Sequence, residues 1–228
     1  MSLRGGKALR AAIFDFDGLI LNTEEAEYEA LKAVFREYGA EIRYEDWAVC
    51  IGTTNALDFW DHLKKVTGGP VDRSAAEKRY RELDEEILAR TPLSPGVKER
   101  LEEAKALGLK LAVASSSSQK WLERHLGERG LMAFFDFLSA RGGAVRHKPH
   151  PDTYLRALTA LGVKFDEAVA LEDSPNGIKS AGAAGIYTIA VPNPVTKQLD
   201  LSSADEIVPS LLDVSFKALA ERFMKGDG

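Results

Sequence analysis

Short runs of apolar residues recur along the chain without alternating polar positions. The first covers residues 11–15, where four apolar residues are followed by a carboxylate. Uninterrupted apolar runs of about four to eight residues are typical of parallel strands that are buried on both faces of a sheet. We therefore predict buried strands here and at three similar runs, with a weaker candidate fifth. These are residues 109–114, 168–171, 187–191 and the weaker 135–138.

Helical patterns separate these runs. Apolar residues recur three or four positions apart over residues 97–107, and Gly108 follows where a helix C-terminal cap is expected. The same spacing over residues 154–161 is followed by Gly162. Strands that alternate with helices indicate βαβ units. The predicted fold class is therefore α/β, with a doubly wound and mainly parallel sheet.

The alternation stops between residues 22 and 91. Only helical patterns are found there, over residues 28–38, 57–63 and 76–87. About 70 residues of helix inserted after the first strand indicate a separate unit. We predict a helical domain over residues 22–91, and an α/β core formed by residues 1–21 and 92–228.

Composition narrows the function classes. Hydrophobic residues make up 45% of the chain and charged residues 29%, which is ordinary for a globular protein and argues against disorder. The net charge of −5 argues against broad binding of nucleic acids or anionic membranes. The longest apolar run, residues 131–135, is too short to span a bilayer. Cys50 is the single cysteine, which excludes an intrachain disulfide and favours a reducing, cytoplasmic location.

Polar residues follow the predicted strands. The first strand leads to Asp15 and Asp17, the second to residues 115–118, and a later one to Glu172 and Asp173. Ligands of an open parallel sheet bind outside the carboxyl ends of its strands. We therefore expect these side chains to gather at one edge, where carboxylates would repel one another unless a cation were bound. Oxygen ligands alone favour Mg²⁺.

The same edge also offers donors for an anion. Serine hydroxyls, backbone N–H groups and Lys148, which precedes a proline in an extended loop, supply them. A metal, an anion seat and a free carboxylate together indicate phosphoryl transfer, with Asp15 as nucleophile and Asp17 as acid and base. Taken singly, each residue also fits an ordinary role. Glu172 and Asp173 could cap the helix that begins near Pro175.

Four ordered motifs resemble those of the haloacid dehalogenase superfamily. Residues 15–23, Asp-Phe-Asp-Gly-Leu-Ile-Leu-Asn-Thr, resemble the first motif, and Ser115 matches the second. Lys148 and the Pro-His-Pro-Asp after it match the third motif, and residues 171–177, Leu-Glu-Asp-Ser-Pro-Asn-Gly, resemble the fourth. The helical insert is similar to the cap of the phosphatase and β-phosphoglucomutase branch. Within it, sugar-phosphate and pseudouridine-5′-phosphate phosphatases are the nearest in character.

The resemblance implies a role for each matched residue. Asp15 would form an aspartyl-phosphate, and Asp17 would be the acid and base. Ser115, the backbone amide of Ser116, and Lys148 would hold the phosphoryl oxygens.

The resemblance also implies a Mg²⁺ site. Asp15, the backbone carbonyl of Asp17 and Asp173 would bind the metal, with Glu172 as a direct or water-mediated ligand. The implied function is a Mg²⁺-dependent hydrolase of a small phosphorylated metabolite. A phosphomutase is the alternative, and a non-enzymatic phospho-acceptor module is a more remote one.

Cap residues are expected to select the substrate. Glu27 stands where β-phosphoglucomutases carry a histidine, and the cap loop offers Gly52, Thr53 and Asn55 in place of their Lys-Gly and Arg. A mutase needs cationic donors for a second phosphate. This departure favours the phosphatase.

Overall fold

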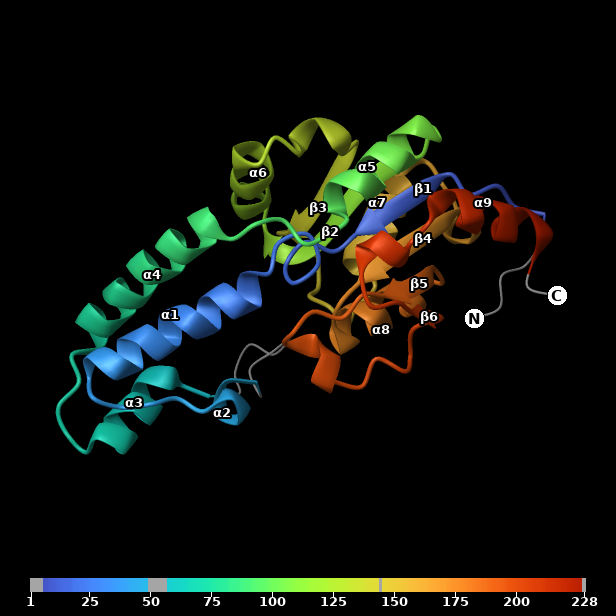
Figure 1. Ribbon diagram of the computed structural model, residues 1–228. Coiled ribbons are helices and arrows are strands. Elements are labelled where there is room, and N and C mark those ends of the chain that lie inside the picture. The colour runs from blue at the N-terminus through green and yellow to red at the C-terminus, as the bar shows by residue number, and fades with distance from the viewer. Residues whose placement is uncertain (1–5, 49–56, 144, 227–228) are drawn as a thin grey trace. The chain divides into compact units, whose positions relative to one another are not determined.

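The computed structural model describes residues 6–48, 57–143 and 145–226. The chain divides into two compact units (Figure 1). One comprises Met1–Leu21 and Leu93–Gly228, and the other is Asn22–Pro92. In the described part of the chain, no helix is long and apolar enough to cross a membrane.

The first unit contains a six-stranded sheet whose paired strands are all parallel. In spatial order, its strands are β3 (Phe137–Arg141), β2 (Lys110–Ser118), β1 (Ala11–Phe14), β4 (Ala168–Glu172), β5 (Tyr187–Ala190) and β6 (Glu206–Ile207). The central strand β1 pairs with β2 on one side and β4 on the other. The predicted α/β class with a doubly wound parallel sheet is confirmed. The short edge strand β6 was not predicted.

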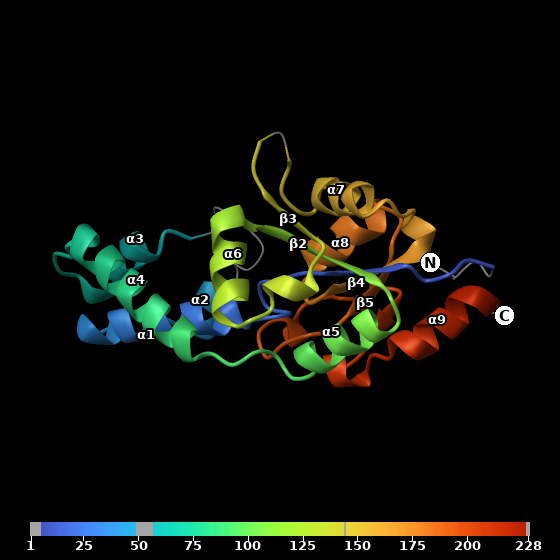
Figure 2. The ribbon, with the colours of Figure 1, turned by 90° about the horizontal axis from the view of Figure 1, so that it is seen from above.

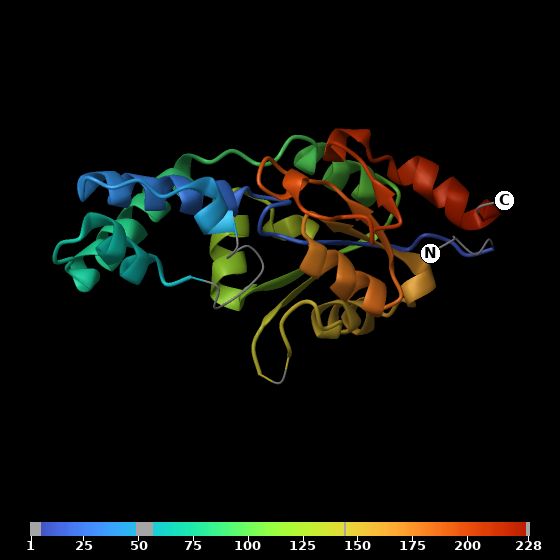
Figure 3. The ribbon, with the colours of Figure 1, turned by 90° about the horizontal axis from the view of Figure 1, so that it is seen from below.

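Helices cover both faces of this sheet (Figures 2 and 3). Helices α7 (Asp152–Leu161) and α8 (Pro175–Ala183) pack on one face, and α5 (Val97–Ala106) and α9 (Phe216–Lys225) lie on the other. Helix α6 (Gln119–Glu128) follows β2 directly. Short 3₁₀ helices occupy Met132–Phe134, Phe165–Glu167, Thr196–Gln198 and Leu211–Asp213.

The core explains why the strands carry no polar alternation. Ile13 belongs to a buried cluster that includes Tyr154 of α7. The next residue, Phe14, points to the opposite face and meets Phe216 of α9 edge to face, with ring centroids 6.2 Å apart. Because successive side chains of a strand alternate between faces, covering both faces with helices requires an apolar residue at every position.

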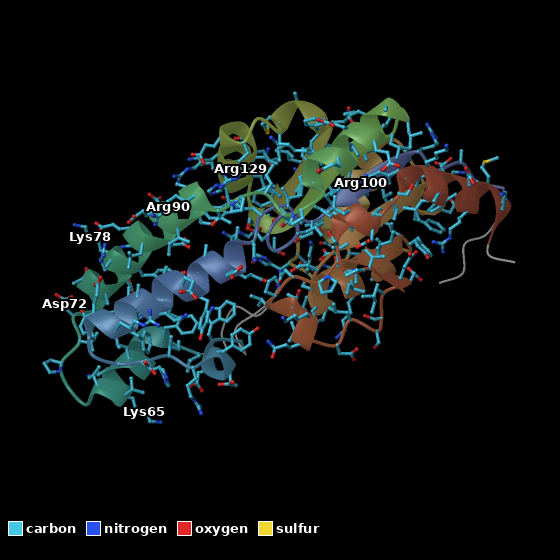
Figure 4. The ribbon with its side chains drawn as sticks, viewed as in Figure 1. Lys65, Asp72, Lys78, Arg90, Arg100 and Arg129 are labelled. Carbon is cyan, nitrogen blue, oxygen red and sulfur yellow. The ribbon has the colours of Figure 1, made fainter. Side chains whose placement is uncertain are left out.

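The second unit is helical. Its elements are α1 (Thr23–Glu37), α2 (Tyr44–Ala48), α3 (Phe59–Thr67) and α4 (Arg73–Arg90), of which α1 and α4 pack together. Asp58 and Asp72, the latter labelled in Figure 4, accept hydrogen bonds from backbone N–H groups of the first turns of α3 and α4. Such caps satisfy donors that the helix itself leaves unpaired. Trp47 is buried in the core of this unit, whereas Trp60 is half-buried against Tyr80.

Asp84 is an uncommon residue for the inner side of a helix. It lies half-buried on α4, and its Oδ1 atom is buried without a hydrogen-bond partner among the described residues. Burial, with a smaller contribution from the Glu85 carboxylate, raises the pKa of Asp84 from 3.8 to about 6. Removing a carboxylate from water disfavours its charged form. Ionised Asp84 therefore destabilises the helical unit.

We predict that Asp84→Asn stabilises the helical unit at pH 8 but not at pH 4. A folded-state pKa above the unfolded value means that stability is lost as the pH rises from about 4 through about 6, and the amide removes that loss. After allowance for partial solvent screening, the gain at pH 8 is about 1 kcal/mol. Thermal unfolding at both pH values measures it. The exposed Glu86→Gln is the matched control, and an equal gain at pH 4 and pH 8 would contradict the prediction.

Candidate active site

Three neighbouring strands bring polar residues to one edge of the sheet. Asp15 follows β1, and its N–H donates to the Leu171 carbonyl of β4 at 2.9 Å, which continues the ladder by one residue. Ser115 lies within β2, and Glu172 is the last residue of β4. Strands β2 and β3 lie on one side of β1, and strands β4 to β6 lie on the other, so the strand order changes direction at β1. Ligands of doubly wound sheets bind at such a switch point.

A buried cation joins two of these carboxylates. Lys148 Nζ lies 2.5 Å from Asp15 Oδ1 and 2.5 Å from Glu172 Oε1. The Lys148 ammonium also lies 5.2 Å from the centre of the Tyr154 ring. The Tyr154 hydroxyl donates to Glu172 Oε1 at 2.6 Å. The loop before α7, the helix itself and the ends of β1 and β4 are thereby connected through charged hydrogen bonds, which are stronger than neutral ones.

Burial shapes the electrostatics of this group. It raises the pKa of Asp15 well above the ordinary range, an effect that Lys148 opposes and that Glu172 and Asp17 reinforce. Burial alone would lower the pKa of Lys148, but the Asp15 and Glu172 carboxylates outweigh it and raise that pKa. Lys148 is therefore a permanent cation. Asp15 depends on nearby positive charge to stay ionised.

Three carboxylates at this edge could hold a metal ion. Asp15, Glu172 and Asp173 are all buried, and each offers one oxygen within 4.8 Å of the others. Carboxylate oxygens at such spacing suit a hard divalent cation, whereas zinc sites usually include nitrogen or sulfur ligands. The donor set therefore fits Mg²⁺.

Asp17 lies beside the end of β2. Its Oδ2 atom accepts hydrogen bonds from Ser117 Oγ at 2.7 Å and from Ser115 Oγ at 3.1 Å. The Trp121 indole of α6 donates to Asp17 Oδ1 at 3.0 Å. Ser116 lies half-buried between the two serines. These three donors to Asp17 are neutral, in contrast to the charged partner of Asp15.

Close approaches at this edge require glycine. Gly18 adopts a φ of +88°, and a Cβ there would lie 2.2 Å from Asp173 Oδ2. Asn193, after β5, links the same parts by donating to Asp173 Oδ2 at 2.8 Å and to the Gly18 carbonyl at 3.1 Å. A Cβ at Gly177, in the first turn of α8, would lie 1.9 Å from Glu172 Oε2. These positions leave no room for a larger residue.

Sequence reasoning missed three residues that contact the predicted site residues: Trp121, Tyr154 and Asn193. Ser117, which contacts Asp17, belongs to the predicted serine run 115–118 but was given no role of its own. Tyr154 was identified only as part of an apolar helix face. Its hydroxyl, buried with the ring, was the available sign of a polar partner.

Other predicted residues have these outcomes. Ser174, rather than Glu172 or Asp173, caps α8 by accepting from the Gly177 N–H at 3.2 Å. That capping alternative was wrong because both carboxylates face the site instead. Glu27 lies exposed on α1, and the predicted cap-loop residues Gly52, Thr53 and Asn55 lie outside the described residues.

We predict that Gly177→Ala destabilises the protein, because the added methyl group overlaps a carboxylate that Lys148 and Tyr154 hold in place. Overpacking of this kind costs about 1–3 kcal/mol. Gly182→Ala in the same helix is the matched control, since nothing lies within 4 Å of its Cβ position. It is expected to gain up to about 1 kcal/mol from helix propensity. Chemical denaturation of both variants measures the difference, and equal stabilities would contradict the described packing.

Known proteins resemble this chain over most of its length. The YhcW protein of Bacillus subtilis is 36% identical over 213 residues, which cover 93% of this chain and 97% of that protein. Hexitol phosphatase B of Escherichia coli K12 is 32% identical and covers 82% of this chain and 86% of its own length. The crystal structure of CbbY from Rhodobacter sphaeroides with xylulose-(1,5)bisphosphate matches with a TM-score of 0.72 and 28% identity, covering 91% and 96% of the two chains.

Comparison with protein-family models also identifies a family for this chain. The model of haloacid dehalogenase-like hydrolases matches residues 12–191, a span that begins in β1 and ends just after β5. It includes every strand that carries a residue of the edge described above. The chain therefore belongs to the haloacid dehalogenase-like hydrolase family.

Proposed function

We propose that this protein is a Mg²⁺-dependent phosphatase that hydrolyses a small phosphomonoester through a phosphorylated Asp15. The observation that carries the proposal is the buried arrangement of Asp15, Lys148 and Glu172 beside Asp173. A carboxylate nucleophile needs a fixed position and compensating positive charge. The similarity to hexitol phosphatase B supports the choice of reaction.

In the first step, an Asp15 carboxylate oxygen attacks the phosphorus atom. The new O–P bond forms as the bond to the leaving oxygen breaks, and Asp17 gives that oxygen a proton. Lys148, Ser115 and the Ser116 amide bind the phosphoryl oxygens. Because Lys148 is held against Asp15, its positive charge lies where the negative charge of the transferring group gathers.

In the second step, water hydrolyses the phosphorylated Asp15. Asp17, now deprotonated, takes a proton from the attacking water, whose oxygen bonds to phosphorus. The bond between phosphorus and Asp15 breaks, which releases inorganic phosphate and restores the carboxylate. One residue thus serves as acid and then as base.

The residues that would hold Mg²⁺ are Asp15, Asp173, the backbone carbonyl of Asp17 and, directly or through water, Glu172. When bound, the cation supplies Lewis acidity and offsets the negative charge of the substrate phosphate. Mg²⁺ would also stabilise the ionised form of Asp15, which burial disfavours.

We infer that the helical unit Asn22–Pro92 is a cap that selects the substrate. Glu27 would favour a phosphatase over a mutase, because a carboxylate repels the second phosphate that a mutase must bind. A mutase differs only in passing the phosphoryl group from Asp15 to a sugar hydroxyl instead of water.

We predict that Asp15→Asn lowers phosphate release by about three orders of magnitude, because an amide cannot replace the attacking carboxylate. Inorganic phosphate released from sugar phosphates, nucleotides and phosphoglycolate with Mg²⁺ measures this loss. Asp213→Asn, which changes an exposed carboxylate outside the site, is the control and should keep full activity.

Two outcomes would contradict the proposal. Retention by Asp15→Asn of more than about a tenth of the wild-type rate would exclude Asp15 as the nucleophile. Conversion of β-glucose 1-phosphate to glucose 6-phosphate in the presence of trace glucose 1,6-bisphosphate, without phosphate release, would identify a mutase.

We predict that EDTA abolishes phosphate release and that Mg²⁺ restores it better than Ca²⁺, which accepts more ligands at longer distances. Mg²⁺ should also raise the melting temperature, because it binds the folded state and relieves carboxylate repulsion. Asp173→Asn should remove most of that rise. Full activity in EDTA, or an equal rise in melting temperature for Asp173→Asn, would exclude this metal site.

A further inference from the structure

Trp121 occupies an unusual position for a tryptophan at the start of a helix. It lies in the first turn of α6, where its backbone N–H donates to the capping Ser118 side chain at 3.3 Å. Its indole N–H reaches back to Asp17 Oδ1 at 3.0 Å. The helix begins directly after β2, the strand that carries Ser115 and Ser117. One continuous segment therefore supplies donors to both oxygens of Asp17.

Aromatic side chains pack against the indole ring of Trp121 and hold it in place. His125, one turn later in α6, packs edge to face against Trp121 with ring centroids 4.1 Å apart. His125 is itself buried and packs against Phe16, with centroids 6.4 Å apart. Phe16 is fully buried and stands between Asp15 and Asp17 in the chain. The ring contacts and the indole hydrogen bond thus form a closed loop around Asp17.

The chemistry of the three donors differs. A serine hydroxyl can donate or accept a hydrogen bond, whereas an indole nitrogen only donates. When the Asp17 carboxyl holds a proton, its carbonyl oxygen is a better acceptor than its hydroxyl oxygen, so the indole N–H favours Oδ1 as the carbonyl oxygen. The proton is then favoured on Oδ2, the oxygen beside Ser115 and Ser117, whose hydroxyls can accept. The indole therefore favours one oxygen of Asp17 as the acid.

We propose that Trp121 is a positioning residue for Asp17 and that its indole N–H holds the carboxyl with Oδ2 ready to protonate the leaving oxygen. This inference rests on the proposed function, in which Asp17 is the acid. It assigns to Trp121 an effect on leaving-group protonation, beyond the packing of α6. The effect should therefore depend on how much help the leaving group needs.

The test compares two substrates by kcat/KM, which covers steps through formation of the phosphorylated Asp15. β-Glycerophosphate has an alkoxide leaving group that requires a proton, whereas 2,4-dinitrophenyl phosphate leaves as a stable phenolate. Trp121→Phe keeps an aromatic ring against His125 and removes the N–H. Loss of one such hydrogen bond should lower kcat/KM about tenfold for β-glycerophosphate and less than about threefold for the dinitrophenyl ester.

Two further variants control for changes in packing. Trp121→3-benzothienylalanine replaces the N–H by sulfur in a ring of nearly the same shape, and it should reproduce the discrimination between substrates. Trp60→Phe, in the helical unit, should leave the ratio of the two kcat/KM values unchanged. Equal losses on both substrates for Trp121→Phe and Trp121→3-benzothienylalanine, or no loss, would overturn the positioning role.

Asp17→Asn separates this inference from the proposed function. It should lower kcat/KM far more for β-glycerophosphate than for the dinitrophenyl ester. If Asp17→Asn shows that discrimination and neither Trp121 variant does, the positioning inference alone fails. If Asp17→Asn affects both substrates equally, Asp17 is not the acid, and that step of the proposed mechanism fails together with the inference, whereas the phosphatase activity itself is tested by Asp15→Asn.

Discussion

The buried ammonium of Lys148 is the charge on which the site depends. Its side chain is 7% exposed, and one partner, Glu172, is fully buried. Desolvating these charges is costly, and only their mutual attraction and further hydrogen bonds offset that cost. Losing one partner of a buried ion pair costs about 3–5 kcal/mol, because the other charge is left uncompensated. The ends of β1 and β4 and the loop before α7 are therefore constrained to meet.

The sheet topology makes this meeting possible. Because β1 lies between β2 and β4, the residues after these three strands share one edge, although they are far apart in the chain. The two halves of the sheet diverge from β1. On the β4 side, Asn193 joins the loop after β1 to the end of β4 by donating to the Gly18 carbonyl and to Asp173. The glycine at position 18 is needed because any Cβ would occupy the space of the Asp173 carboxylate. The positive φ of Gly18 and the closeness of the Asp173 carboxylate thus both require glycine at this position.

The central strands were predictable from sequence because burial on both faces leaves an uninterrupted apolar run. The sequence pattern was less informative where polar residues continue a strand: β2 extends through Ser118, four residues beyond its apolar part. The third strand begins at Phe137, two residues later than its apolar run. The preceding apolar residues form a 3₁₀ turn, and the Asp136 side chain accepts from the Leu111 N–H at 2.7 Å. The edge strand β6 has only two residues and shows no run at all.

Most of the predicted site residues could be named from sequence because they lie at or just beyond the end of an apolar run, whereas Lys148 was named from its place before a proline in a loop. Their supporting residues could not, because support acts across the fold. Trp121 contacts a residue 104 positions away, and Asn193 one 20 positions away. The helical spacing of Tyr154 is that of an ordinary core residue. Only the three-dimensional structure shows that its hydroxyl donates a hydrogen bond to Glu172. Local patterns specify which element a residue joins, whereas partners depend on how the elements are packed.

Under the proposed function, the charges at this edge would couple substrate binding to metal binding. The site combines four carboxylates with one ammonium: Asp15, Asp17, Glu172 and Asp173 with Lys148. A phosphomonoester near neutral pH adds almost two further negative charges. The indole and hydroxyl donors around Asp17 orient it but carry no charge, so they cannot offset this repulsion. A divalent cation can, and we infer that substrate affinity at this edge depends on metal occupancy as much as on direct contacts to the phosphate.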